Sequence, residues 1–274
     1  MPELPEVETI VRQVRPALVG RTITRAVLSH DNVLRGVTKR RLLRGLRGAD
    51  IHDVARRAKH AIIDLGSRRL VIQPGMTGSL MVYDRPLSRD EARYAVLRAP
   101  LDDGTELIYR DVRRIGRIYL LDQPAYEAYS AGLGPEPLAR SFDDAAFARA
   151  LAGTRQAIKK AIMDQRRVAG IGNIYANEAL FAARIDPSKP ADALLRDQRI
   201  RLRREVRRIL NAAVRSQGST VRDYRTGTGQ QGRFQLELEV YGRQGEPCAV
   251  CGTRLTGTHA IDGRMTVFCH RCQA

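Results

Sequence analysis

The chain opens with the stretch Met1-Pro2-Glu3-Leu4-Pro5-Glu6-Val7-Glu8-Thr9. A helix is predicted to begin at Leu4 and to run to about Leu18, because apolar residues recur there at helical spacing. Pro5 suits the first turn of such a helix, and acidic side chains are favoured at its positive end. We expect the rest of the chain to fold around this helix and the residues just before it.

The residues before the helix include a candidate nucleophile. If Met1 is removed, the nitrogen of Pro2 becomes a free secondary amine, and α-amino groups titrate roughly 2 to 3 units below lysine. Amines that attack carbon electrophiles form Schiff bases, and the carboxyl of Glu3 stands next in the chain as an acid or base. The alternative is a capped surface helix without a catalytic role, since acidic residues are ordinary in a first helical turn.

The chain is strongly basic. Its 274 residues include 47 Lys and Arg against 30 Asp and Glu, which gives a net charge of +17. This excess predicts a polyanionic partner, and nucleic acid is favoured over a membrane surface. The sequence has no signal-peptide pattern and no apolar run of membrane-spanning length. We therefore expect a cytoplasmic protein, nucleoid-associated if bacterial, with no membrane partner.

All four cysteines lie near the C-terminal end, as Cys248-Ala-Val-Cys251 and Cys269-His-Arg-Cys272. Two C-x2-C pairs at this spacing predict one tetrahedral, structural Zn²⁺. Disulfide bonds are the alternative, which a chain with no other cysteine and no export signal disfavours. His259 and His270 could compete as ligands, but four thiolates already complete the coordination of zinc.

Residues 22–121 have the pattern of strands. Short apolar or alternating runs are separated there by Gly, Pro and Asp, and they predict about eight strands in a two-sheet sandwich. The predicted strands are 23–28, 51–55, 61–65, 70–73, 79–82, 94–98, 106–109 and 118–121. Residues 39–44 predict a short basic helix with a solvated face, and 56–60 predict a strand junction suited to a phosphate contact.

Beyond a linker at 132–137, which is rich in Gly and Pro, the apolar period becomes helical. Ser141 with Asp144 is suited to cap a helix that ends at 151, and further helices are predicted over 156–165, 174–183 and 197–217. The glycine-rich turn 168–173 offers backbone N–H groups to a phosphate, although Asn173 also suits a plain N-cap. Residues 218–232 predict a mobile loop.

Several motifs, in their order and spacing, resemble the Fpg/Nei family of bacterial formamidopyrimidine-DNA glycosylases. They are PELPEVET at 2–9, RRAK at 56–59, GMTGSL at 75–80, DVRRIG at 111–116, GLGPEPL at 132–138, AIKKAIMDQRRVAGIGNIYANEALF at 157–181, VYGRQGEPC at 240–248 and both cysteine pairs. The resemblance covers the whole chain. It implies an α+β fold with an N-terminal catalytic β-sandwich and flanking helices at 1–131 and a linker at 132–141. A helix-two-turn-helix domain with a mobile lesion-capping loop would follow at 142–234, and a zinc-finger hairpin at 235–274.

The resemblance also implies the reaction. Pro2 would attack C1′ of a damaged nucleotide in double-stranded DNA and displace an oxidised purine, 8-oxoguanine or a formamidopyrimidine, while Glu3 would protonate the sugar ring oxygen. β-Elimination and δ-elimination would then remove the sugar. Lys59 matches a phosphate-gripping position at the catalytic centre, and Arg264 matches the finger arginine implicated in δ-elimination. Surface charge is the alternative for Lys59, as it is for Lys159, and solubility of the hairpin tip is the alternative for Arg264. We expect a monomer that acts in base excision repair.

The damaged base has to leave the stack, and something has to fill the gap. The resemblance assigns this plug to Met76, Arg113 and Ile115, the last being a departure because the family usually carries Phe there. An aliphatic side chain can still wedge between base steps. Lys159 and Asn173 match phosphate-gripping positions, and Arg93 stands where many members have a His-containing DNA contact. The alternative for Met76 is a turn hydrophobe packed on the sandwich.

Two other functions fit parts of the sequence. The endonuclease VIII branch of the family has the same nucleophile but excises oxidised pyrimidines; PELPEV and VYGRQGEPC favour the purine branch. A non-catalytic zinc-ribbon protein that recognises bent or nicked duplex would explain the charge and the cysteines. It would leave the Pro2-Glu3 pair without a role.

Overall fold

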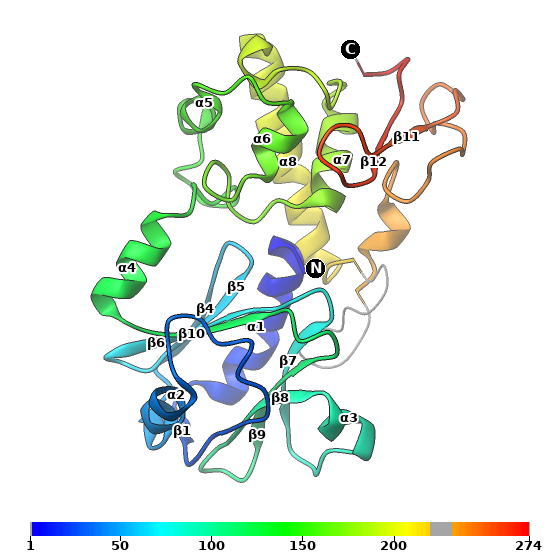
Figure 1. Cartoon of the computed structure of the whole chain (residues 1–274). Helices are drawn as coiled ribbons and strands as arrows, with labels where there is room; N and C mark the ends of the chain where they lie inside the picture. Colours follow the sequence, from blue (N-terminus) through cyan, green and yellow to red (C-terminus); the bar gives the residue numbers. More distant parts are fainter. Residues whose placement is uncertain (1, 220–231, 274) are drawn as a thin grey trace. The chain divides into compact units, whose positions relative to one another are not determined.

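The computed structural model describes residues 2–219 and 232–273, which form two compact units (Figure 1). The first unit holds the described residues of 1–131 and 216–235, and the second holds those of 132–215 and 236–274. The predicted domains assign residues 216–234 to the helical domain, whereas the described part of this segment clusters with the first unit. The segment clusters with the first unit because it contacts the first helix, for example through the hydrogen bond from Ser219 N to Glu6.

The first unit contains two four-stranded antiparallel sheets. One sheet has the strand order β10 (Arg117–Asp122), β6 (Arg68–Gln73), β5 (His60–Asp64) and β4 (Asp53–Arg57). The other has the order β2 (Val27–Leu28), β8 (Ala95–Pro100), β9 (Glu106–Asp111) and β7 (Gly78–Tyr83). The predicted two-sheet architecture is confirmed.

Helix α1 (Leu4–Leu18) packs against β4, β5 and β7, and so contacts both sheets. Its buried Val7, Ile10 and Val14 share one core with residues of each sheet, such as Ile63 and Tyr109. Burying an aliphatic side chain of this size stabilises the fold by about 1.5–3 kcal/mol. The helix predicted from the first stretch is therefore present, and the core fixes the position of its first turn.

One predicted strand, 23–28, is divided between two pairings. Strand β1 (Thr22–Ile23) pairs with β3 (Ala49–Asp50), whereas β2 pairs with β8. An apolar run does not specify its neighbours, because strand pairing is decided by tertiary contacts.

The described residues of the first unit form three further α-helices. The predicted basic helix is α2 (Lys39–Leu46), which Thr38 caps by accepting a hydrogen bond from Arg41 N. The other two, α3 (Arg89–Arg93) and α4 (Gln123–Ala131), were not predicted from the sequence. Neither helix buries a residue, so neither carries the apolar stripe on which helix prediction relies.

The second unit contains α5 (Asp144–Leu151), α6 (Ile158–Met163), α7 (Asn173–Ala182) and α8 (Arg196–Arg215), as predicted to within a few residues. The short helix η1 (Ala191–Ala193) precedes α8, and η2 (Phe234–Glu237) follows the segment that is not described. The predicted cap of α5 is wrong: Asp143, and not Ser141, accepts the hydrogen bond from Ala146 N, at 2.7 Å.

Several arginines of α8 form hydrogen bonds and an ion pair with other residues of the second unit. Arg201 Nε donates to Ala183 O at 2.7 Å, Arg207 Nη1 donates to Ala139 O at 2.6 Å, and Arg203 pairs with Asp144. Helix C-termini and loops leave carbonyl groups without helical partners, and these guanidinium groups satisfy some of them. Part of the positive charge is therefore structural.

The C-terminal hairpin pairs β11 (Thr256–Thr258) with β12 (Thr266–Phe268). Phe181 of α7 packs into one small core with Val240, Val267 and two of the cysteines. Of the predicted mobile loop 218–232, residues 220–231 lie outside the described residues. Across the described ranges, no helix is both long and apolar enough to cross a membrane.

Candidate functional site

Pro2 and Glu3 lie buried at the start of α1. Glu3 is the N-cap of the helix and is 4% exposed. The carboxylate of Glu6 accepts two backbone hydrogen bonds at this point, from Glu3 N at 2.8 Å and from Ser219 N at 2.8 Å. This one carboxylate therefore ties the chain around the candidate nucleophile to the segment that follows α8.

Glu6 also explains the glycine at 218. Gly218 has a φ of +80°, and a Cβ at this position would lie 2.9 Å from Glu6 Cγ. Only glycine combines this backbone conformation with so close an approach. The role of Glu6 was not predicted from the sequence, although an acidic residue three positions after the N-cap is the capping-box signal that could have indicated it.

Lys59 lies in the tight turn between β4 and β5 and is 4% exposed. Arg56 holds this turn, because its guanidinium donates to Ala58 O at 2.9 Å and to Glu8 Oε2 at 2.8 Å. Burial raises the pKa of Glu8, but the hydrogen bonds and charges of Arg56 and Arg12 outweigh burial, so the pKa is lowered. The ion pair ties the predicted strand junction, and Lys59 with it, to the helix that begins next to Pro2.

The structure brings Met76, Arg113 and Ile115 together. Arg113 Nη1 lies 2.9 Å from Met76 Sδ, and Ile115 Cγ1 lies 2.8 Å from the position that a Cβ on Gly75 would take. Met76 is 43% exposed and Ile115 is 48% exposed. Single exposed apolar side chains are ordinary on a protein surface, so this exposure leaves both residues accessible to a partner but does not by itself assign them a role. The alternative for Met76, a hydrophobe packed on the sandwich, does not agree with this exposure.

Asp111 organises the loop that carries Arg113 and Ile115. Its carboxylate is fully buried and accepts hydrogen bonds from four donors. These are Thr77 Oγ1 at 2.6 Å, Gly116 N at 2.8 Å, Arg113 N at 3.2 Å and Tyr109 Oη at 3.2 Å. Burial, together with the charge of Asp111, raises the pKa of Tyr109. Asp111 belongs to the DVRRIG motif, but its role was not predicted from the sequence, because its burial is not visible there.

Arg93 is the last residue of α3 and is exposed. Its guanidinium lies 5.4 Å from the centre of the Tyr94 ring. Tyr94 O accepts the hydrogen bond of Asp111 N at 3.0 Å, so Arg93 stands close in the fold to the loop that Asp111 holds.

Lys159 and Asn173, both in the second unit, contact the C-terminal hairpin. Lys159 is fully buried on α6, and its Nζ donates to Thr266 Oγ1 at 2.7 Å and to Asp262 Oδ1 at 3.3 Å. Asn173 Nδ2 donates to Met265 O at 3.0 Å. The N-cap alternative for Asn173 is wrong, because Gly172 is the N-cap of α7 and Asn173 is its first helical residue. A solvated surface position is equally wrong for Lys159.

Glu178 of α7 is a further residue that the sequence analysis missed. Its carboxylate accepts backbone hydrogen bonds from Glu239 N at 2.9 Å, Val240 N at 3.0 Å and Tyr241 N at 2.8 Å. Burial raises the pKa of Glu178, and the three hydrogen bonds oppose this rise. The VYG segment that leads into the cysteine pairs is thereby fixed to α7.

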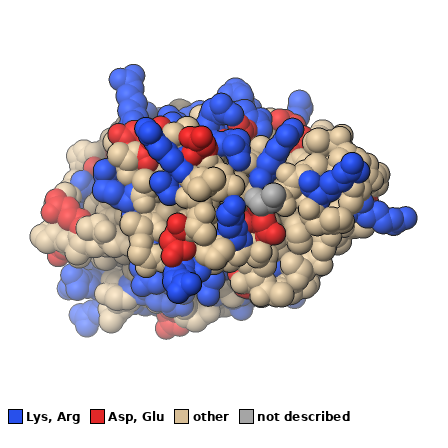
Figure 2. Space-filling model, turned by 90° about the horizontal axis from the view of Figure 1, so that it is seen from above, with Lys and Arg blue, Asp and Glu red and all other residues tan. Residues whose placement is uncertain are grey.

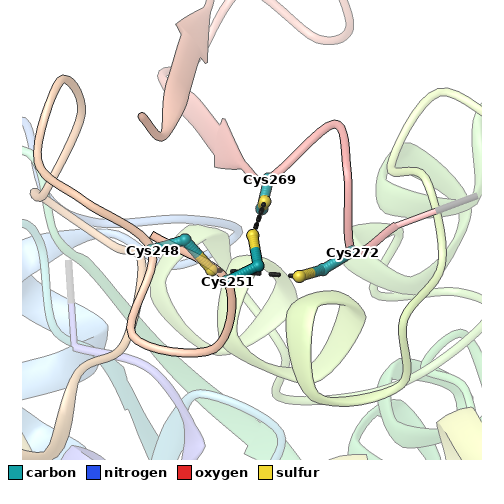
Figure 3. A group of neighbouring side chains, drawn as sticks. All are labelled: Cys248, Cys251, Cys269 and Cys272. Carbon is teal, nitrogen blue, oxygen red and sulfur yellow. Dashed lines mark hydrogen bonds between the residues drawn. The ribbon is translucent and has the colours of Figure 1, made fainter. Parts of the chain in front are cut away.

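The four cysteines meet at one point (Figure 3). Their sulfur atoms all lie within 4.8 Å of one another, and none forms a disulfide. The closest pairs, Cys251–Cys269 at 3.5 Å and Cys248–Cys272 at 3.9 Å, are too long for a covalent bond of about 2.05 Å. Hydrogen bonds from Thr253 lower the pKa of Cys251 to about 6, whereas burial and the neighbouring thiols raise the pKa of Cys272 to about 12. A bound dication would favour the thiolate at both positions, so the donor set fits a metal.

Lys and Arg side chains project over much of the face drawn in Figure 2, with fewer Asp and Glu between them. Arg264, at the tip of the hairpin between β11 and β12, is exposed. These exposed cations suit a polyanion.

Two family models match parts of the chain. The formamidopyrimidine-DNA glycosylase N-terminal domain matches residues 1–118, and the formamidopyrimidine-DNA glycosylase H2TH domain matches residues 133–225. The chain belongs to the formamidopyrimidine-DNA glycosylase family. Its similarity to formamidopyrimidine-DNA glycosylases extends over the full length. The protein from Stutzerimonas stutzeri is 43% identical over 273 residues, covering 100% of both chains. That from Chloroflexus aurantiacus is 41% identical and covers 100% of this chain and 98% of the relative.

Solved structures of formamidopyrimidine-DNA glycosylases have the same fold. The MutM (Fpg) protein of Thermus thermophilus superimposes with a TM-score of 0.86 at 37% identity, over 99% of this chain and 98% of that one. The wild-type Lactococcus lactis Fpg (MutM), in complex with DNA that contains N7-benzyl-Fapy-dG, gives a TM-score of 0.89 at 32% identity, over 99% of both chains. The family and the α+β fold expected from the sequence are thus confirmed.

Proposed function

We propose that the chain is a bifunctional DNA glycosylase and abasic-site lyase that excises oxidised purines from duplex DNA in base excision repair. The observation that carries the proposal is the position of Pro2 and Glu3, buried at the first turn of α1 with the adjoining backbone fixed by Glu6. The capping box alone is an ordinary helix device, but the burial of Pro2 and the second hydrogen bond, from Ser219 N, go beyond it. Full-length similarity to formamidopyrimidine-DNA glycosylases supports the substrate class.

Pro2 is the proposed nucleophile once Met1 has been removed. Its secondary amine attacks C1′ of the damaged nucleotide, the bond from C1′ to the base breaks, and the amine and sugar form an iminium ion. Glu3 donates a proton to the ring oxygen as the sugar opens. The iminium makes the C2′ proton acidic, so its removal expels the 3′ phosphate by β-elimination, and δ-elimination then expels the 5′ phosphate.

The remaining site residues are proposed to hold the DNA. Met76 and Ile115 are exposed apolar side chains that suit the gap left by a flipped base, and Arg113 beside them suits contact with the opposite base. Lys59 and Arg264 are proposed to contact the phosphates flanking the lesion, and Arg93 a phosphate further along. Lys159 and Asn173, which hold the hairpin, are proposed to act on the phosphates largely through it.

The four cysteine thiolates are proposed to bind one structural Zn²⁺. Zinc bound by four protein ligands has no open coordination position, so it stabilises the hairpin and takes no part in the chemistry. The full set of proposed ligands is Cys248, Cys251, Cys269 and Cys272. We further infer that the chain acts as a monomer on double-stranded DNA in the bacterial cytoplasm.

Borohydride trapping on a duplex with 8-oxoguanine opposite cytosine tests the proposal. Wild-type protein lacking Met1 should form a covalent adduct, and the same protein acetylated at its N-terminal amine should form none. A Pro2→Gly variant, which keeps a primary amine, should trap more slowly. Equal trapping by acetylated and unmodified protein would show that another residue is the nucleophile. Faster excision of thymine glycol than of 8-oxoguanine would instead favour the oxidised-pyrimidine branch.

A further inference from the structure

Asp262 lies in the turn between β11 and β12, two residues before Arg264. Its side chain is 7% exposed, although the residues that follow it, Gly263 and Arg264, are exposed. Its Oδ1 accepts a hydrogen bond from Lys159 Nζ at 3.3 Å and another from Arg264 N at 3.1 Å. One carboxylate oxygen therefore joins a buried ammonium group on α6 to the backbone of Arg264.

The ion pair with Lys159 holds the carboxylate of Asp262 in one position. A fully buried ammonium requires hydrogen-bonded or charged partners, because desolvation strongly disfavours an isolated charge. Lys159 has both kinds, the hydroxyl of Thr266 at 2.7 Å and the carboxylate of Asp262 at 3.3 Å. Attraction between two charges is stronger when water is excluded. The ion pair thus anchors Asp262 to α6 rather than leaving it in an exposed turn.

Arg264 is held on both sides through its neighbours. Asp262 binds its backbone N–H, and Asn173 Nδ2 binds the carbonyl of the next residue, Met265, at 3.0 Å. The turn itself contains Gly263, whose φ of +75° is a conformation that glycine adopts without strain. The backbone of Arg264 is therefore fixed, while the residue itself is exposed to solvent.

We propose that Asp262 is a positioning residue for Arg264. Together with Lys159, it sets the backbone at the hairpin tip so that the guanidinium meets the phosphate flanking the lesion in one orientation. Preorganising a cation in this way reduces the ordering needed when the substrate binds. The inference rests on the proposed function of Arg264, and it assigns to Lys159 an indirect role through Asp262.

Single-turnover strand cleavage on an abasic-site duplex tests the proposal with the variants Asp262→Ala, Asp262→Asn and Arg264→Ala and with the double variant D262A/R264A. Asp262→Ala should slow cleavage roughly 10- to 100-fold, the range for a displaced catalytic contact. Asp262→Asn keeps an oxygen acceptor for Arg264 N but removes the negative charge beside the buried Lys159, so it should slow cleavage less than Asp262→Ala does, by roughly 3- to 10-fold. In the Arg264→Ala background, Asp262→Ala should have no further effect. Asp186→Ala, which removes a carboxylate from another turn of the same unit, is the matched control.

Two results in this series would overturn the proposal. One is wild-type cleavage by Asp262→Ala while Arg264→Ala is slow. The other is a double variant slower than Arg264→Ala by the full factor of Asp262→Ala, because that result means that Asp262 stabilises the fold without acting through Arg264. Zinc content, measured for every variant, identifies hairpins that have unfolded. If Asp262→Ala has lost its zinc, Asp262→Asn replaces it in the comparison with wild type and with Arg264→Ala.

Amide hydrogen exchange of the peptide that contains Arg264 gives a readout independent of activity. Exchange should be faster in Asp262→Ala than in wild type at equal zinc content. An unchanged exchange rate would refute the claim that Asp262 fixes the backbone of Arg264. If wild type forms no covalent adduct, the proposed function fails, and the exchange measurement still decides whether Asp262 fixes the hairpin tip.

Discussion

Replacing Asp111 is predicted to separate base excision from abasic-site cleavage. The carboxylate of Asp111 is 0% exposed and receives two hydroxyl and two backbone N–H hydrogen bonds. It fixes the loop between β9 and β10, which carries Arg113 and Ile115. Under the proposed function, excision from an intact duplex uses this loop to fill the stack, whereas an abasic site has no base to displace. Loosening the loop should therefore slow excision more than cleavage.

The loss of unfolding free energy in Asp111→Ala can be worked out from the hydrogen-bond donors that would lose their acceptor. In Asp111→Ala the two hydroxyls can rotate, and Arg113 N keeps a second acceptor, Thr77 Oγ1 at 2.9 Å. Gly116 N is buried and loses its charged partner outright. A hydrogen bond to a charged group contributes about 1.5–3 kcal/mol, so with the cavity left behind we expect a loss of about 3–4 kcal/mol in the free energy of unfolding. Asp111→Asn keeps one oxygen for Gly116 and Tyr109 and should lose about 1–2 kcal/mol.

Urea unfolding and single-turnover kinetics on matched duplexes measure these effects. Asp111→Asn should remain folded and slow 8-oxoguanine excision by roughly tenfold, with abasic-site cleavage within about threefold of wild type. Asp103→Asn, an exposed turn carboxylate that accepts hydrogen bonds from Thr105, is the control and should change neither quantity. A loss of under about 1 kcal/mol in Asp111→Ala, or equal slowing of both reactions in Asp111→Asn, would refute the reasoning.

Three further predictions concern stability and the metal. Burial lowers the pKa of His60 to about 4 from 6.5, so the unfolded chain binds the proton first as the pH falls. Unfolding free energy should therefore drop by about 2 kcal/mol between about pH 7 and pH 5, which urea midpoints measure; His60→Asn should lose this dependence and His52→Asn, at an exposed position, should keep it. Glu178→Gln leaves at least one of three backbone N–H groups unpaired and should lower the unfolding free energy by about 1–3 kcal/mol in the same assay, whereas the exposed Glu237→Gln should not. Chelation should remove about one zinc per chain and abolish DNA binding, as metal analysis and fluorescence anisotropy would show; active protein free of zinc would contradict a structural role.

The sequence alone determined the features that depend on local pattern. The 3.6-residue period indicated α1 and α5 to α8, because each buries apolar residues at helical spacing. The spacing of the cysteines predicted the cluster at which four sulfur atoms meet, since two C-x2-C turns suit a tetrahedral ion. The ordered motifs indicated the family. Helices that bury nothing, α3 and α4, have no such pattern and were missed.

Only the tertiary structure decided which polar groups are buried, because burial depends on residues far away in the chain. Asp111, Glu178 and Lys159 look like ordinary surface charges in sequence, yet each lies inside the protein and fixes a separate segment. A buried charge has to be paired, and its partners are set by the packing of helices and strands rather than by sequence spacing. For the same reason the run 23–28, continuous in sequence, was divided between two strand pairings by contacts that no local pattern contains.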